Sequence, residues 1–135
     1  MRSLVAEDDV TNRVLLQKFL SRFGQCDIAF NGKDAVNAIR AARQERQSYD
    51  LVCMDLRMPE MDGNKAIHEI RAQEAAECVY NPVIIIVTTS CSDTESIKGA
   101  LLGPCNAYLV KPINTARLLD ELKKLGMIKK MEAAS

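Results

Sequence analysis

The chain has 135 residues, which is enough for one domain with a buried core of its own. Its 18 basic and 18 acidic residues cancel, so charge gives no reason to expect nucleic acid or an acidic membrane as a partner. No apolar run reaches the roughly 18 residues of a membrane-spanning helix, and no basic and then apolar leader opens the chain. We therefore expect a soluble, cytoplasmic protein.

Cysteine and histidine usage argues against metal sites built from thiolate or imidazole ligands. The five cysteines are scattered and form no C-x-x-C pair, which favours reduced thiols packed as small apolar residues. His68 is the only histidine, so a site with several imidazole ligands is excluded.

Short continuous apolar runs, typical of buried strands, alternate along the chain with apolar residues at helical spacing. Strands are expected over residues 4–6, 26–30, 51–54, 83–87 and 106–110. Apolar residues at helical spacing within 15–23, 35–42, 66–70, 97–101 and 118–125 mark five helices, the first of which is expected to start near Thr11. The connection 73–81 shows no clear pattern, and the tail 127–135 has no obvious fold of its own.

Five βα units within residues 1–126 predict a single α/β domain. The run Val-Ile-Ile-Ile-Val at 83–87 does not alternate with polar residues, which is typical of a strand covered on both faces in a parallel sheet. We expect a flavodoxin-like, doubly wound (βα)5 sheet in three layers, with strand order 2-1-3-4-5 and right-handed crossovers.

Polar residues stand where four of these strands end: Glu7 and Asp8, Asp55, Thr88 or Thr89, and Lys111. Parallel strands end at one edge of the sheet, and in this order strands one and three are neighbours, so the three acids are expected to converge. Close carboxylates repel one another unless a cation joins them, and Mg²⁺ prefers such oxygen ligands. Strand-end acids are otherwise solvated loop residues or helix caps, the role we expect for Asp9.

The set of groups at this edge suits phosphoryl transfer. A lysine after a strand is usually solvated, but beside a metal and carboxylates Lys111 could bind an anion as a point charge. A threonine hydroxyl could donate to the same anion. Asp55 would then be the nucleophile, forming an acyl phosphate.

From Leu4 to about Gly126 the chain resembles a response-regulator receiver domain of two-component signalling. The resemblance rests on LVAED at 4–8, MDLRMPEMDG at 54–63, VTTS at 87–90 and NAYLVKP at 106–112. It implies that Asp55 is the phosphoacceptor and that Asp8 and Asp55 bind Mg²⁺, or Mn²⁺ in its place. Glu7 would act through water, and the carbonyl of Arg57 would be a further ligand.

The resemblance also implies roles for the residues around the phosphoryl group. Lys111 would bind it, aimed inward by a cis Lys111–Pro112 peptide. Thr89 is chosen over Thr88 as the switch hydroxyl, since a small residue follows it and its spacing to Lys111 matches the family without a gap. Tyr108 matches the aromatic residue that moves inward with that hydroxyl.

As a receiver domain, the protein would be a phosphorylation-controlled switch and not an enzyme that turns over, although it would promote its own phosphorylation and dephosphorylation. Its donor would be a histidine kinase or a histidine phosphotransfer protein. A downstream protein would bind the face formed by helix four, strand five and helix five, with the domain a monomer or a phosphorylation-dependent dimer. Departures from the family pattern are Pro104, which stands where glycine is common, and the long connections 43–48 and 73–81.

Two other functions remain open from the residues alone. A magnesium-dependent hydrolase of the haloacid-dehalogenase type also uses an aspartyl nucleophile, but it carries D-x-D, and here Leu56 and Arg57 follow Asp55. A pseudo-receiver or a flavodoxin-like cofactor binder would bind without phosphorylation. The complete set of acids, threonine and lysine argues against a pseudo-receiver, and the missing glycine-rich phosphate loop after strand one argues against a flavodoxin-like cofactor binder.

Overall fold

The computed structural model describes residues 1–58, 61, 63–90 and 105–128. Its elements in chain order are β1 (Ser3–Ala6), α1 (Val10–Leu20), β2 (Cys26–Ala29), α2 (Gly32–Gln44), β3 (Leu51–Asp55), α3 (Gly63–Ala76), β4 (Ile84–Thr89), β5 (Ala107–Val110) and α5 (Thr115–Lys124). The strands form one parallel sheet in the order β2-β1-β3-β4-β5, which confirms the predicted flavodoxin-like arrangement. The helix predicted over 97–101, with Cys91 and Pro104, lies outside the described residues.

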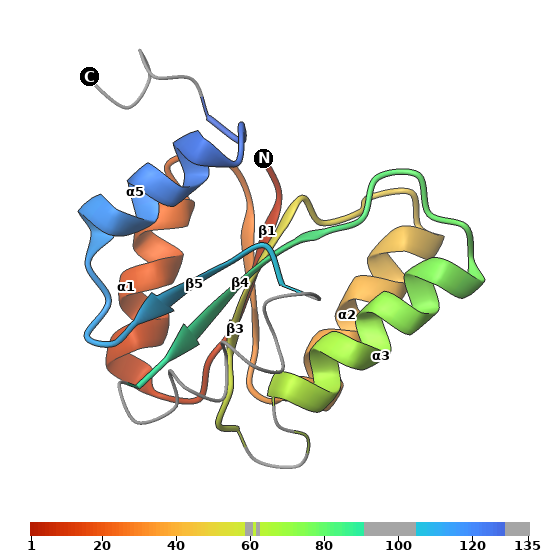
Figure 1. The fold of residues 1–135 in the computed structure, drawn as a ribbon, viewed down its shortest axis with the longest axis horizontal. Helices are drawn as coiled ribbons and strands as arrows, with labels where there is room; N and C mark the ends of the chain where they lie inside the picture. The colour runs from red at the N-terminus through yellow and green to blue at the C-terminus, as the bar shows by residue number, and fades with distance from the viewer. Residues whose placement is uncertain (59–60, 62, 91–104, 129–135) are drawn as a thin grey trace.

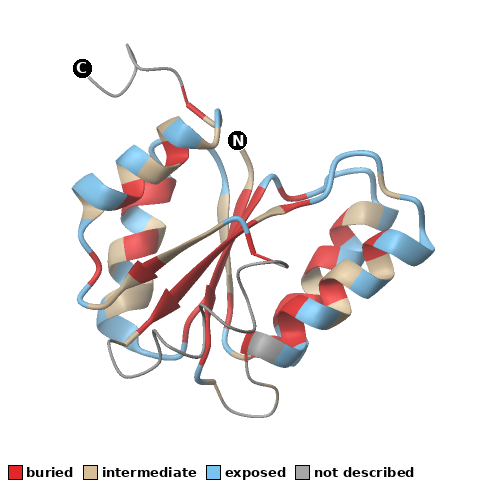
Figure 2. Cartoon of the chain, viewed as in Figure 1, coloured by how far each residue is buried: buried red, intermediate tan, exposed pale blue. Residues whose placement is uncertain are grey.

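Helices cover both faces of the sheet, as Figure 1 shows: α1 and α5 lie on one side, and α2 and α3 on the other. The side chains of each strand alternate between these two layers, so the core divides into two clusters. In β4, Ile85 and Val87 pack toward α2 and α3, whereas Ile86 packs toward α1 and α5. Figure 2 shows β3 and β4 almost entirely buried, as the unbroken apolar run at 83–87 predicts.

Helix starts follow from side-chain caps. Asp9 accepts a hydrogen bond from the amide of Asn12 at 3.0 Å, as predicted, and α1 begins directly after it. The apolar spacing that begins at Leu15 marks only the interior of this helix, and the cap expected at Asp9 correctly places its start. Asn31 and Asn114 cap α2 and α5 in the same way.

One helix end differs from the prediction. Residues 73–76, predicted as part of a connection, belong to α3, which runs to Ala76. At the other end of the chain, Ile128 is 8% exposed and packs in the cluster beneath α1 and α5. Among the described residues, no helix has the length and apolar character that spanning a membrane requires.

The edge of the sheet where β1 and β2 begin is held by a cluster of polar side chains. The Tyr49 hydroxyl donates to Asp27 Oδ2 at 2.6 Å, and the Arg2 guanidinium lies 4.8 Å from the centre of the Tyr49 ring. Burial and the bond to Asp27 raise the pKa of Tyr49 to about 12, so its phenol remains protonated. The amide of Arg2 also donates to Asp50 at 2.8 Å.

Candidate functional site

Three carboxylates meet at the opposite edge of the sheet, where the strands end. Glu7 and Asp8 follow β1, and Asp55 is the last residue of β3. The pairing of Ala6 with Met54 places Glu7 beside Asp55, and one oxygen from each of the three acids lies within 4.8 Å of the others. We call these residues the acidic cluster. Their predicted convergence is confirmed.

Two members of the acidic cluster are removed from solvent. Glu7 is 0% exposed and Asp55 is 5% exposed, whereas Asp8 is open to solvent. Burial, opposed by the bond from Lys111 and reinforced by the charge of Asp55, raises the pKa of Glu7 to about 7. Near neutral pH, Glu7 is therefore only partly ionised unless a further cation offsets the negative charge of the cluster. Three hard oxygen donors, one of them open to solvent, fit a divalent ion such as Mg²⁺.

Lys111 enters the cluster from the end of β5. Its Nζ lies 3.0 Å from Glu7 Oε1 and 3.3 Å from Asp55 Oδ2, and the peptide bond to Pro112 is cis, as predicted. Burial alone would lower the pKa of Lys111, but the bond to Glu7 and the charge of Asp55 outweigh burial and raise it. The ammonium therefore stays charged and placed beside Asp55.

The two candidate threonines point to different places. Asp55 and Thr88 are paired in the parallel register of β3 and β4, so their side chains lie on the same face of the sheet. The Thr88 hydroxyl donates to Glu7 Oε2 at 3.5 Å, and Thr88 is 1% exposed. The Thr89 hydroxyl donates to the carbonyl of Ser90 at 3.2 Å.

Thr88 is therefore the hydroxyl that contacts the acidic cluster in this structure. Thr89 pairs with Val110, next to Lys111, and its side chain lies on the same face of the sheet as that of Tyr108. The choice of Thr89 as the switch hydroxyl stays a prediction.

Arg57 and Tyr108, which were also predicted for the site, make different kinds of contact. The main-chain amide of Arg57 donates to Asp55 Oδ1 at 3.2 Å, a contact that orients the carboxylate and that the sequence did not indicate. Tyr108 is half-buried on β5 and packs against the cluster of apolar residues beneath α2 and α3. It is thus on the opposite face of β5 from Leu109, which packs toward α1 and α5.

The backbone after Asp55 folds back tightly onto it. The amide of Gly63 donates to the carbonyl of Leu56 at 2.8 Å. A Cβ atom at Gly63 would lie 2.2 Å from the Asp55 carbonyl oxygen, closer than any side chain tolerates. Glycine is therefore required where α3 begins, because any other side chain there would collide with the backbone of Asp55 and displace it.

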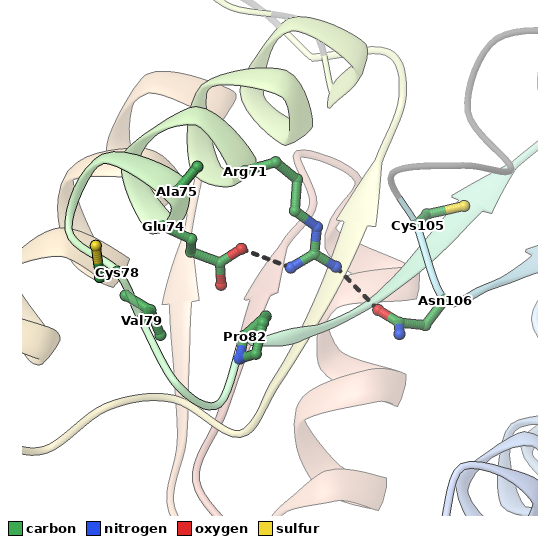
Figure 3. A pocket seen from close by; sticks show the side chains of 8 residues that line it. All are labelled: Arg71, Glu74, Ala75, Cys78, Val79, Pro82, Cys105 and Asn106. Carbon is green, nitrogen blue, oxygen red and sulfur yellow. Dashed lines mark hydrogen bonds and ion pairs between the residues drawn. The ribbon is translucent and has the colours of Figure 1, made fainter.

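A cavity of about 470 Å³ lies at the other edge of the sheet, where β4 and β5 begin. Figure 3 shows Arg71 between Glu74 on one side and Asn106 on the other. Its guanidinium donates to Glu74 Oε1 at 2.7 Å and to Asn106 Oδ1 at 3.0 Å. Arg71 also donates to the carbonyl of Val83, whose amide donates to Glu74 at 2.7 Å. These polar groups hold the start of β4, so we assign this cavity a structural role and place the chemistry at the acidic cluster.

Comparison with protein families matches residues 4–123 to the response regulator receiver domain. The sensory/regulatory protein RpfC of Xanthomonas campestris is 33% identical over 127 residues, which are 94% of this chain and 17% of RpfC. The transcriptional regulatory protein ZraR of Salmonella typhimurium is 36% identical over 123 residues, or 90% of this chain and 25% of ZraR. The chain thus spans a quarter or less of these relatives.

Solved structures show the same resemblance. The receiver domain of the Pseudomonas aeruginosa sensor histidine kinase PA1611, with a magnesium ion in its active site cleft, is 31% identical with a TM-score of 0.72, covering 91% of this chain and 94% of its own. The receiver domain of Saccharomyces cerevisiae Ssk1, in complex with the histidine phosphotransfer protein Ypd1, is 32% identical with a TM-score of 0.70, covering 87% and 83%. This chain belongs to the response-regulator receiver domain family of two-component signalling.

Proposed function

We propose that this receiver domain accepts a phosphoryl group on Asp55 from the phosphohistidine of a histidine kinase or a histidine phosphotransfer protein. The observation that carries the proposal is the position of Asp55: its carboxylate ends β3 within the acidic cluster, 3.3 Å from the ammonium of Lys111. An Asp55 oxygen would attack phosphorus, and the P–N bond to the donor imidazole would break with its electron pair going to nitrogen. The product is an acyl phosphate on Asp55.

The acidic cluster would hold Mg²⁺, or Mn²⁺ in its place. Asp8 and Asp55 would be direct ligands, Glu7 would act through water, and the carbonyl of Arg57 would complete the protein's share. When bound, the ion supplies positive charge that offsets the repulsion between the carboxylates and an incoming phosphoryl group. The magnesium in the PA1611 receiver domain supports this assignment.

Two side chains would receive the phosphoryl oxygens. Lys111 already lies within an ion-pair distance of Asp55, and its ammonium would bind the added negative charge. Thr89 lies at the end of β4 on the face of the sheet that carries Tyr108, so we keep it as the switch hydroxyl. Tyr108 is retained as the aromatic residue that responds, and its movement inward stays a prediction.

The protein would be a switch that also promotes its own dephosphorylation, and not an enzyme that turns over a free substrate. The complex of the Ssk1 receiver domain with Ypd1 supports a phosphotransfer partner. A downstream partner on the face of helix four, β5 and α5 stays a prediction, as do the cytoplasmic location and a monomer that dimerises on phosphorylation. The predicted helix four lies outside the described residues.

Incubation with acetyl phosphate and Mg²⁺, followed by intact-mass measurement, tests the proposal. We expect the mass of one phosphoryl group on the wild type, none on Asp55→Asn, and one on the matched control Asp62→Asn, which changes another acid of the same stretch. Phosphorylation of Asp55→Asn at the wild-type rate would reject Asp55 as the acceptor. Sustained release of phosphate from added esters would favour the hydrolase instead.

The two threonines offer a matched pair for the switch assignment. Thr89→Ala removes the proposed switch hydroxyl, so beryllofluoride affinity at saturating Mg²⁺ should fall by about tenfold, the effect of one hydrogen bond to a charged group. Thr88→Ala should change that affinity by less than about twofold, because its hydroxyl bonds to Glu7. The reverse order would make Thr88 the switch residue.

A further inference from the structure

The start of α2 packs directly against the segment that follows Asp55. The amide of Gly32, the first residue of α2, donates to the carbonyl of Met61 at 3.1 Å. A Cβ atom at Gly32 would lie 2.2 Å from the oxygen of that carbonyl and 3.0 Å from its carbon. Gly32 is buried, so only a hydrogen atom fits between the start of α2 and this segment.

The same segment is closed into a loop by its own backbone. The amide of Gly63 donates to the carbonyl of Leu56 at 2.8 Å, which brings the two ends of residues 56–63 together. Within this closed loop lies Arg57, whose carbonyl is a proposed Mg²⁺ ligand and whose amide donates to Asp55 Oδ1 at 3.2 Å. The bond from α2 therefore ties the loop that carries a proposed ligand to an element outside it.

The start of α2 can act as an anchor because it is itself firmly held. Asn31 caps the helix: its Oδ1 accepts the amide of Asp34 at 2.8 Å, and its Nδ2 donates to Asp34 Oδ2 at 3.2 Å. Just beyond, Ala35 and Val36 are buried in the apolar cluster beneath α2 and α3. The anchor thus belongs to the packed core and not to the loop that it holds.

We propose that Gly32 is a positioning residue for the metal site. Its amide and its lack of a side chain hold the loop after β3 in place, so that the carbonyl of Arg57 can act together with the acidic cluster as a Mg²⁺ ligand. Gly32 itself touches neither the metal nor the phosphoryl group. This inference rests on the proposed function, since it assumes the proposed Mg²⁺ ligands, and it adds to the site a helix that supplies none of them.

A methyl group at position 32 would displace the loop. Real Cβ atoms do not approach another atom within 3.0 Å, so the Met61 carbonyl oxygen would have to move by about 0.8 Å, the shortfall from that limit. The obstacle is backbone, so a change of side-chain rotamer cannot relieve it. Mg²⁺ demands nearly ideal octahedral geometry, and groups that orient metal ligands without touching the metal typically contribute about 10–100-fold in affinity.

The affinity for Mg²⁺, measured by isothermal titration calorimetry without a phosphodonor, tests the proposal. In Gly32→Ala it should fall by about tenfold. Gly126→Ala is the matched control, because Gly126 has a φ of +73° and, in the part of the chain that the structure describes, no atom lies within 4 Å of a Cβ there. Alanine at that position strains the backbone without displacing a neighbour, so this control should lose stability but keep the Mg²⁺ affinity of the wild type.

Wild-type Mg²⁺ affinity in folded Gly32→Ala would overturn the proposal. An equal loss of affinity in Gly126→Ala would also overturn it, because the effect would then follow from reduced stability alone. If Gly32→Ala does not fold, Asn31→Ala takes its place. Loss of the cap loosens the start of α2, so the Mg²⁺ affinity should fall by about threefold, and an unchanged affinity would reject the proposal.

Phosphorylation of the wild type by acetyl phosphate is measured alongside. A wild type that binds Mg²⁺ but gains no phosphoryl group on Asp55 rejects the proposed function, while the loss of Mg²⁺ affinity in Gly32→Ala still supports the positioning role. A phosphorylated wild type whose Mg²⁺ affinity is unchanged in Gly32→Ala rejects only the role of Gly32. A wild type that does not bind Mg²⁺ rejects both.

Discussion

Replacing Glu74 and Glu77 by alanine compares two ion pairs that differ mainly in burial. Glu74 lies 2.7 Å from Arg71, and Glu77 lies 2.8 Å from Arg43. The Glu74 side chain is 5% exposed and that of Glu77 is 43% exposed. Glu74 lies in α3, where alanine is the best helix former, and Glu77 follows the end of that helix, so neither change should cost helix propensity.

The expected loss of stability differs several-fold between the two variants. Glu74→Ala removes the acceptor of the buried Val83 amide, which lies 2.7 Å from Glu74, and removes a carboxylate that Arg71 contacts. A lost hydrogen bond to a charged group together with an unsatisfied buried donor costs about 3 kcal/mol of unfolding free energy. Glu77→Ala removes a largely exposed partner, which is worth less than about 1 kcal/mol.

Urea unfolding followed by circular dichroism measures the difference. With a slope of about 2 kcal/mol/M, typical of a small protein, the midpoint should fall by about 1.5 M in Glu74→Ala and by less than about 0.5 M in Glu77→Ala. Equal shifts of the midpoint in the two variants would refute the reasoning that burial and the bond to the Val83 amide make Glu74 more important for stability than Glu77. An unchanged midpoint in Glu74→Ala would show that water replaces its bonds.

Two further predictions concern the backbone at Asp55 and the acid limit of stability. Gly63→Ala forces a Cβ against the Asp55 carbonyl, so the unfolding free energy should fall by about 1–3 kcal/mol and the phosphorylation rate should fall with it. A variant with the stability and the phosphorylation rate of the wild type would contradict this close contact. Burial raises the pKa of Asp27, but hydrogen bonds from Gln25 and Tyr49 outweigh burial and lower it below 3.8. The stabilisation of the fold by ionised Asp27 is therefore complete well above pH 3.8 and disappears as pH falls through the lowered pKa. The difference in unfolding free energy between wild type and Asp27→Asn, measured by urea unfolding, should narrow from pH 6 to pH 3. A difference that does not depend on pH would contradict the assignment.

The sheet could be predicted from the sequence because buried parallel strands have a distinctive pattern. The run at 83–87 has no polar alternation, and strand-end acids, threonine and lysine at suitable separations point to one edge. Helix starts were harder. Val10 and Val14 in the first turns of α1 are 59% and 48% exposed, so apolar spacing does not reveal that the helix has begun.

Other parts of the site depend on the reach of side chains and on strand register, which apolar patterns do not encode. Thr88 and Thr89 are adjacent and chemically identical, and only the pairing of Asp55 with Thr88 shows which one faces the acidic cluster. The contact between Glu7 and Lys111 joins residues 104 positions apart and depends on the length of both side chains. Arg71 and Glu74 could have been found from their spacing of three residues on a helix, had the helix been predicted to continue that far.

The contacts of Arg71 and Asn106 have a mechanical consequence for the signal. The side chain of Asn106 accepts the amide of Ile85 at 2.8 Å and a bond from Arg71 at 3.0 Å, so β4 and β5 are tied together where they begin. Lys111, beyond the far end of β5, is held by contacts that a phosphoryl group would exchange. If Asp55 is phosphorylated as proposed, we expect β5 to move by rotation about a hinge near Asn106, with a displacement that grows with each residue toward Lys111.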